Sequence, residues 1–124
     1  MQVAIELGAP QYKVGQRPEL KLVVTNAGQV PCTREVSRAL REILVVTQDG
    51  NTRLWSSNDC NRANLPPESQ ILQPGEHLGY EVRWAGRTSA PGCPLKRTTV
   101  QAGTYAVVGK LGGLTSPAVP LVLA

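Results

Sequence analysis

The sequence predicts an all-β domain built as an antiparallel β-sandwich, and three observations lead to this prediction. The chain carries 12 glycines and 10 prolines along its whole length, as in folds whose many short strands are joined by turns. Segments such as QVAIEL at 2–7 alternate apolar and polar residues, which is the pattern of a strand with one buried face. Residues 43–55 place two strand-like runs on either side of an Asp-Gly pair, a strong signal for a β-hairpin.

About seven or eight short strands are expected from this pattern. In chain order they lie at 2–7, 12–14, 19–28 with its closing turn, 43–55 as a hairpin, 71–84 with its Pro-Gly turn, 105–108, and 116–124. Pro117 and Pro120 predict an edge position for the last strand. Proline has no backbone N–H group, so it cannot donate a hydrogen bond to a neighbouring strand. The segment 30–42 is the least strand-like and allows one short helical turn between Ser37 and Arg41.

A strand, an Arg-Pro turn, a second strand and an Asn-Ala-Gly turn open the chain in this order. This order is typical of immunoglobulin-like sandwiches. At 124 residues the length is that of one domain, so residues 1–124 are expected to form a single immunoglobulin-like β-sandwich.

Charge and hydropathy argue against two classes of partner. The formal net charge of +4 is small and evenly scattered, which does not favour nucleic-acid binding. The densest basic group, Arg34, Arg38 and Arg41, is interpreted as a solvated face. No apolar run approaches the roughly 18 residues of a membrane span, and no signal peptide precedes the first strand, so tethering to a membrane would need a segment outside 1–124.

The few aromatic residues are predicted to fill the core, since the chain has no phenylalanine. They are Trp55, Tyr80, Trp84 and Tyr105. An alternative for the two tryptophans is that one of them is exposed as a platform that stacks on carbohydrate.

The stretch LWSSNDC at 54–60 holds residue types that catalysis uses. Ser56, Ser57 and Asp59 offer a nucleophile and an orienting group, but the only histidine, His77, lies on the polar face of a later strand. Nothing in the spacing brings that base to them, as nucleophilic catalysis requires. The cysteines stand far apart, without the close pairs of a zinc site. The sequence therefore predicts no catalytic residue, no metal and no cofactor, and a protein that is not an enzyme.

The three cysteines, Cys32, Cys60 and Cys93, allow one disulfide and one free thiol. Cys60 and Cys93 lie in turn-rich loops, each of which follows a strand that ends in tryptophan. We predict that these two loops meet and that Cys60 pairs with Cys93, which leaves Cys32 free; the pairing of Cys32 with Cys60 remains an alternative. Candidate interaction residues on the two loops are Ser57, Asp59, Arg62, Arg87, Ser89 and Lys96.

Several motifs together resemble a known family. They are L-x-V-x-N from Leu22, D-G…W from Asp49, L-x-P-G-E from Leu72, Y-x-x-x-W from Tyr80 and G-T-Y from Gly103. Their order is similar to that in intracellular-proteinase-inhibitor-like (BsuPI-type) domains. The cysteine elements P-C-x-R-[ED]-V, W-S-S-x-D-C and S-x-P-G-C resemble the related β-sandwich ectodomains of actinobacterial cell-envelope proteins.

The resemblance implies an immunoglobulin-like fold that is tethered outside the membrane and has no known chemistry of its own. The expected function is therefore that of a non-catalytic, extracytoplasmic binding or structural domain of the bacterial cell envelope, which engages a protein or a cell-wall component. The alternative is a proteinase-inhibitor domain, which would present a loop to a protease, either from Asn58 to Glu68 or from Arg87 to Lys96.

Overall fold

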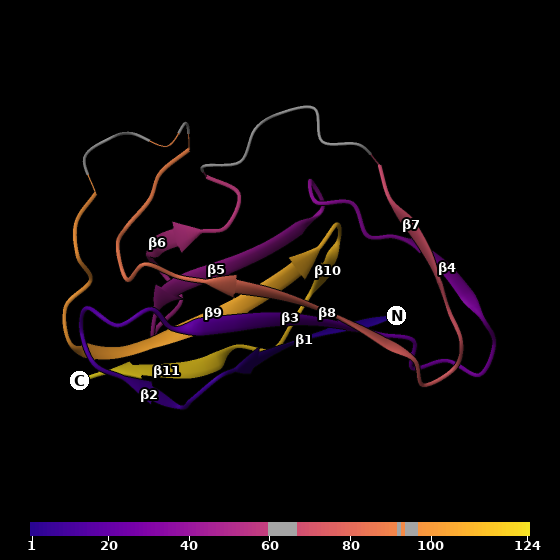
Figure 1. Ribbon diagram of the computed structural model, residues 1–124, viewed down its shortest axis with the longest axis horizontal. Coiled ribbons are helices and arrows are strands. Elements are labelled where there is room, and N and C mark those ends of the chain that lie inside the picture. Colours follow the sequence, from indigo (N-terminus) through magenta and orange to yellow (C-terminus); the bar gives the residue numbers. More distant parts are fainter. Residues whose placement is uncertain (60–66, 92, 94–96) are drawn as a thin grey trace.

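The regular structure of this protein consists of strands (Figure 1). The computed structural model describes residues 1–59, 67–91, 93 and 97–124. Within these residues there is no helix, and hence none that is long and apolar enough to cross a membrane. The strands are β1 (Gln2–Leu7), β2 (Gln11–Tyr12), β3 (Glu19–Thr25), β4 (Cys32–Glu35), β5 (Arg41–Thr47), β6 (Arg53–Ser56), β7 (Ser69–Leu72), β8 (His77–Arg83), β9 (Gly103–Leu111), β10 (Leu114–Thr115) and β11 (Val119–Leu123).

The strands form two larger sheets and a separate two-stranded ribbon. One sheet has the order β1-β3-β8, and the other has the order β2-β11-β9-β5-β6 with β10 paired to β9. The ribbon consists of β4 and β7. All these pairs are antiparallel except the short parallel pair of β11 with β2. The predicted all-β class with antiparallel sheets is confirmed.

Apolar side chains from both larger sheets meet in one buried cluster. Alternate residues of each strand enter it, as period-2 patterning requires; they include Val3 and Ile5 of β1, Leu20, Leu22 and Val24 of β3, Ile43 and Val45 of β5, Val107 and Leu111 of β9, and Leu121 and Leu123 of β11. Each fully buried leucine or valine stabilises the fold by roughly 1.5–3 kcal/mol relative to exposure. This aliphatic cluster holds the two sheets against each other.

The two sheets pack closely at Gly109 of β9. A Cβ atom there would lie 2.5 Å from Cδ1 of Leu22 and 2.9 Å from Cδ1 of Ile5. These distances are shorter than two carbon atoms can approach without a clash, since their optimal separation is about 3.5–4.0 Å. A glycine is therefore needed at this position of β9, because the side chains of Ile5 on β1 and Leu22 on β3 pack directly against it.

The hairpin predicted at 43–55 is formed by β5 and β6. In its turn, Oδ1 of Asp49 accepts hydrogen bonds from the Thr47 hydroxyl at 2.6 Å and from the Asn51 amide at 2.9 Å. These bonds, that from Thr47 foremost, lower the pKa of the exposed Asp49 carboxyl below its ordinary value. Gly50 follows with φ of 80°, a left-handed conformation that glycine adopts without steric cost.

The segment 30–42 differs most from expectation. Residues 32–35 form β4, which pairs with β7 from Cys32↔Leu72 to Glu35↔Ser69. The helical turn predicted between Ser37 and Arg41 is a single hydrogen-bonded turn, in which the Ser37 carbonyl accepts from the amides of Leu40 and Arg41. It does not continue as a helix because Arg41 already begins β5.

The edge position predicted for the last strand is correct for only part of β11. This strand lies between β9 and β2, so its C-terminal end is not an edge: Val122 and Leu123 pair with β2. Pro120 lies opposite Ala106 of β9, at a position that β2 does not reach. The proline thus occurs where the second side of the strand is open, and two residues of β2 cover the rest.

Replacement of Gly109 by alanine tests the close approach of the two sheets. We expect Gly109→Ala to lower the free energy of unfolding by about 1–3 kcal/mol, because the added methyl group must displace Leu22 or Ile5 in a filled core. Urea denaturation measures this change. Gly113→Ala is the matched control, since a Cβ atom at Gly113 meets nothing within 4 Å; its effect is expected to stay within about 0.5 kcal/mol. Equal stability of the two variants would contradict the packing described.

Candidate functional site

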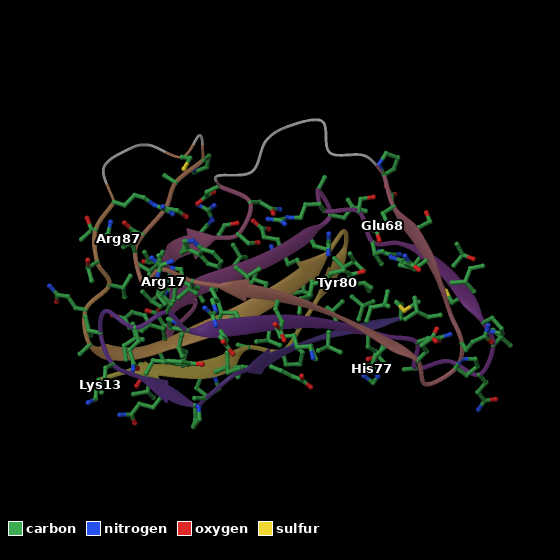
Figure 2. All side chains as sticks on the ribbon, in the orientation of Figure 1. Lys13, Arg17, Glu68, His77, Tyr80 and Arg87 are labelled. Carbon is green, nitrogen blue, oxygen red and sulfur yellow. The ribbon has the colours of Figure 1, made fainter. Side chains whose placement is uncertain are left out.

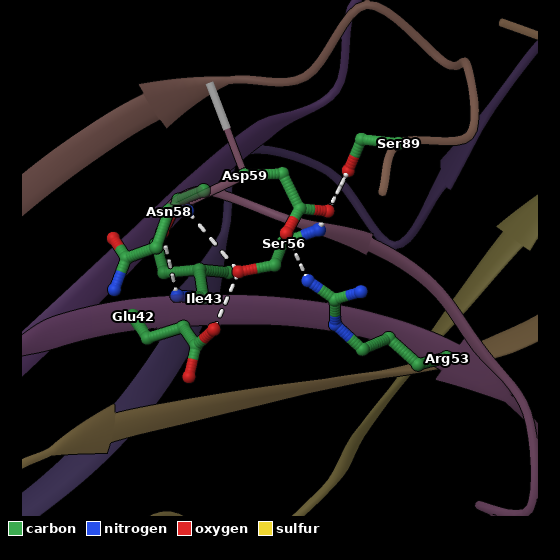
Figure 3. Close-up of polar contacts among 8 residues, drawn as sticks. Glu42, Ile43, Arg53, Ser56, Asn58, Asp59 and Ser89 are labelled. Carbon is green, nitrogen blue, oxygen red and sulfur yellow. Dashed lines mark hydrogen bonds and ion pairs between the residues drawn. The ribbon is translucent and has the colours of Figure 1, made fainter. Parts of the chain in front are cut away.

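Ser56, at the end of β6, has a buried hydroxyl with two partners (Figure 3). The hydroxyl donates to Oε2 of Glu42 at 2.5 Å and accepts from the amide of Asn58 at 3.1 Å. It therefore closes the turn that follows β6 and links it to β5. The hydroxyl group thus uses its proton for Glu42 and accepts the Asn58 amide in a local side-chain-to-backbone bond.

Ser57 extends the pairing of β5 with the chain beyond β6. Its amide donates to the carbonyl of Ile43 at 2.9 Å, and its hydroxyl accepts from the amide of Ile43 at 2.9 Å. The side chain thus replaces the backbone carbonyl that a regular antiparallel pair would supply. Ser57 has a structural role in which its hydroxyl oxygen is an acceptor.

Asp59 is the buried charged residue of this stretch. Its side chain is 4% exposed, and it forms an ion pair with Arg53 through Oδ1. Oδ2 accepts from the hydroxyl of Ser89, as Figure 3 shows. A buried carboxylate is costly unless it is paired and hydrogen-bonded, and these two residues meet that requirement.

Ser89 joins the second long loop to β6. Its amide donates to the carbonyl of Leu54 at 2.9 Å, and its hydroxyl accepts from the amide of Ser56 at 3.1 Å. With the bond to Asp59, three contacts fasten the segment around Ser89 to the end of β6. The two loops that the sequence placed near each other do meet here.

His77 takes no part in this network. It begins β8 in the other sheet, opposite Thr25, and is exposed (Figure 2). Within the described part of the chain, no hydrogen bond joins it to Ser56, Ser57 or Asp59. The described residues also contain no group of three or more His, Cys, Asp or Glu side chains that could hold a metal ion.

The predicted interaction residues have different positions. Asp59 is a correction: its carboxylate is buried in the network, so it is not presented to a partner. Ser57 and Ser89 are half-buried and contribute the bonds given above, whereas Arg87 is exposed. Arg62 and Lys96 lie outside the described residues, as does most of the segment from Asn58 to Glu68 that the inhibitor alternative would use.

The cysteines fall into two environments. Cys32 on β4 is a free, half-buried cysteine, whose Sγ lies 3.8 Å from the carbonyl oxygen of Thr33. Cys93 is disulfide-bonded, and its amide donates to the carbonyl of Ala90 at 3.0 Å. Cys60 lies outside the described residues, so its pairing with Cys93 stays a prediction.

The predicted core aromatics contact the buried cluster. Trp55 and Trp84 are 7% and 0% exposed, and their rings pack with centroids 6.0 Å apart and planes at 43°. The indole N–H of Trp84 donates to the carbonyl of Arg87 at 3.0 Å. Tyr80 and Tyr105 are partly buried against the same cluster. The core assignment is confirmed, and the alternative of an exposed tryptophan platform is wrong.

A pocket that the sequence did not predict opens between β8 and the start of β5. Its volume is about 240 Å³, and its lining residues are Leu22, Arg38, Arg41, Glu42, Ile43, Ser57, Gly79, Tyr80, Glu81 and Val82. The guanidinium carbon of Arg41 lies 3.8 Å from the ring centroid of Tyr80, in a cation–π contact. Nε of Arg41 is buried and has no hydrogen-bond partner within the described residues.

The electrostatics of this pocket act on the Tyr80 hydroxyl. Burial raises the pKa of Tyr80 above its ordinary value, and the Glu68 carboxylate adds to the increase, while the Arg41 cation opposes it. The phenol therefore stays protonated through neutral pH. In the sequence, Arg41 lies in a basic run and Tyr80 at an inward-facing strand position; only the packing of the two sheets brings them together.

A double-mutant cycle tests the network around Asp59. We expect Asp59→Ala to lower the free energy of unfolding by about 1.5–3 kcal/mol, because Arg53 and Ser89 both lose a charged acceptor. Ser89→Ala should also destabilise. In the double variant the effects should be less than additive, with a coupling of at least about 0.5 kcal/mol, measured by urea denaturation.

The control for the serine is Ser69→Ala, at an exposed position on β7, with an expected change within about 0.5 kcal/mol. Full additivity of Asp59→Ala and Ser89→Ala would contradict the direct bond between these residues.

Comparisons with known proteins bear on the fold. No family model and no curated protein matches the chain. Among solved structures, the chain is similar to the β-glucosidase EmGH1 of Erythrobacter marinus, with a TM-score of 0.50 and 11% identity over 98% of this chain and 15% of the enzyme. A β-glucosidase of Listeria innocua in complex with gluconolactone gives a TM-score of 0.50 and 10% identity, over 99% of this chain and 16% of the enzyme.

A third similar structure is the alkylpurine DNA glycosylase AlkC of Pseudomonas fluorescens bound to DNA containing an abasic site analog. Its TM-score is 0.53 and its identity 12%, over 99% of this chain and 30% of the glycosylase. The chain thus spans less than a third of the length of each of these three proteins. At such identities the similarity shows the fold alone: nearly the whole chain matches an arrangement that is a part of larger proteins.

Proposed function

We propose that this chain is a non-catalytic, immunoglobulin-like β-sandwich domain of the bacterial cell envelope, which acts outside the cytoplasm by binding a protein or a cell-wall component. The finer fold assignment is supported by the two sheets that share one buried cluster. The match of nearly the whole chain to parts of larger proteins supports the assignment of residues 1–124 to one domain. The motif resemblance to envelope ectodomains suggests the compartment.

The observation that carries the non-catalytic assignment is the use of the LWSSND side chains inside the fold. Ser56 bonds to Glu42 and Asn58, and Ser57 bonds to Ile43. Asp59 is saturated by Arg53 and Ser89. Ser56 and Asp59 are also buried, whereas a nucleophile or base must come within hydrogen-bond reach of the substrate.

The cysteines support a location outside the cytoplasm. A disulfide at Cys93 is typical of proteins from oxidising compartments and rare in the cytosol. We propose Cys60 as its partner, which would fasten the loop after β6 to the loop that Ser89 already holds. A bridge closing a loop of about 30 residues stabilises by about 3–4 kcal/mol in the chain-entropy model. Attachment to the membrane would come from a segment outside residues 1–124.

Location and redox state are tested together in the organism that makes the protein. Cells are fractionated, and the chain is detected by antibody and alkylated under denaturing, non-reducing conditions. We expect it in the envelope or secreted fraction, with one alkylated cysteine, Cys32, before reduction and three afterwards. A cytosolic chain with three reactive thiols would overturn the proposal.

Binding is tested with the purified chain and the insoluble envelope fraction of the same cells. We expect the chain to sediment with either the membranes or the isolated cell wall, and an excess of unlabelled chain to displace it. If it remains in the supernatant with both fractions, the binding role is wrong, whatever the location of the protein.

A further inference from the structure

Strand β8 has one edge that no described strand pairs with. It lies at the end of the sheet order β1-β3-β8, so its only neighbour among the described strands is β3. The edge of the other sheet at β6 is covered differently, because Ser89 bonds there to the backbone of Leu54 and Ser56. No described residue covers β8 in this way. An uncovered edge of seven residues is a template for the addition of another strand.

The phase of the β3–β8 ladder shows which backbone groups face the open edge. Trp84 donates to the Pro18 carbonyl at 2.9 Å, and Asn26 donates to the Glu76 carbonyl at 3.0 Å. Hydrogen-bonded pairs alternate with non-bonded pairs in an antiparallel ladder. With the register of β3 and β8, the bonds to β3 are therefore made at the even-numbered positions 78, 80 and 82. The N–H and C=O groups of Gly79 and Glu81 point outward.

The pocket described above lies against this edge. Gly79, Tyr80, Glu81 and Val82 all line it, although successive side chains of a strand point to opposite faces. Backbone atoms of this stretch therefore border the pocket along with side chains, as expected where a pocket lies at the edge of a strand. The unpaired backbone groups of Gly79 and Glu81 are thus next to about 240 Å³ of open space.

The side chains across the pocket favour an anion on the inner side. The Arg41 guanidinium stacks on Tyr80, and its buried Nε–H has no acceptor within the described residues. Its planar set of donors matches a carboxylate in a two-point contact. Glu42 also lines the pocket, but one of its oxygens already accepts from Ser56. An incoming carboxylate would give the Arg41 cation an acidic partner, which it lacks among the described residues.

We propose that the open edge of β8 is a docking site for an extended peptide segment, which adds a strand to the sheet and places an Asp or Glu side chain against Arg41. This rests on the proposed binding function and names a protein as the partner class. A peptide is favoured over a cell-wall sugar because the outward groups of Gly79 and Glu81 match the repeat of another strand. Main-chain bonds give affinity in such additions, and the pocket selects the acidic side chain.

The test uses the 124-residue chain and two blocked peptides with strand-forming residues, Ac-TVEVT-amide and Ac-TVQVT-amide, followed by amide NMR. We expect the Glu peptide to shift the amide signals of Gly79 and Glu81 saturably, and the Gln peptide to bind about tenfold more weakly. Arg41→Gln should abolish the difference between the peptides. Glu81→Pro should weaken both, because it removes an outward N–H without removing a bond to β3.

Arg17→Gln, which removes an exposed arginine elsewhere on the surface (Figure 2), is the matched control and should leave both affinities unchanged. The amide spectra of all variants report whether each is folded. Absence of binding up to about 10 mM peptide, equal affinity for the two peptides, or occupation of the edge by a second copy of the chain would overturn the proposal. This test uses only the purified chain and the peptides. Its failure would therefore overturn peptide docking at β8, and the sedimentation experiment would still decide whether the chain binds an envelope fraction.

Discussion

A carboxylate that is taken out of water must be paired, and the buried Asp59 imposes this requirement on one end of the molecule. Arg53 and Ser89 supply its partners, and Ser89 bonds in turn to the backbone of Leu54 and Ser56. The network therefore determines where the chain after β8 must lie relative to β6. Removing any member would leave a buried polar group without its partner, which costs more than the bond itself contributes.

The same network explains how a stretch with catalytic residue types is used to stabilise the fold. LWSSND contains the residue types of a hydrolase site, yet each polar side chain is directed to a structural partner. The pocket at β8 has the opposite character. There, as far as the described residues show, Arg41 keeps an unpaired buried donor and β8 keeps unpaired backbone groups. Groups that the fold leaves unsatisfied are where a ligand has the most to contribute, so we place the binding surface at β8.

Local patterns predicted much of the fold. The alternation at 2–7 and the Asp-Gly turn specified β1 and the β5–β6 hairpin, because a strand face and a tight turn depend on neighbouring residues alone. β4 was missed, since its residues lack alternation and it exists only by pairing with β7, more than thirty positions away. The contacts of Ser89 and Arg41 were not predicted for the same reason: their partners, Asp59 and Tyr80, are distant in the chain. Burial of Asp59 was unpredictable from a polar, turn-rich segment.

Residues 56–59 and the segment around Ser89 are expected to form one cooperative unit with the core. Native-state amide hydrogen exchange measures this, since it reports the free energy needed to open each hydrogen bond. The amides of Ser56 and Ser89 should exchange only through global unfolding, with the same opening free energy as that of Val45 in the core. An opening free energy about 2 kcal/mol or more below that of Val45 would show that this end opens as a loop, and would contradict the account.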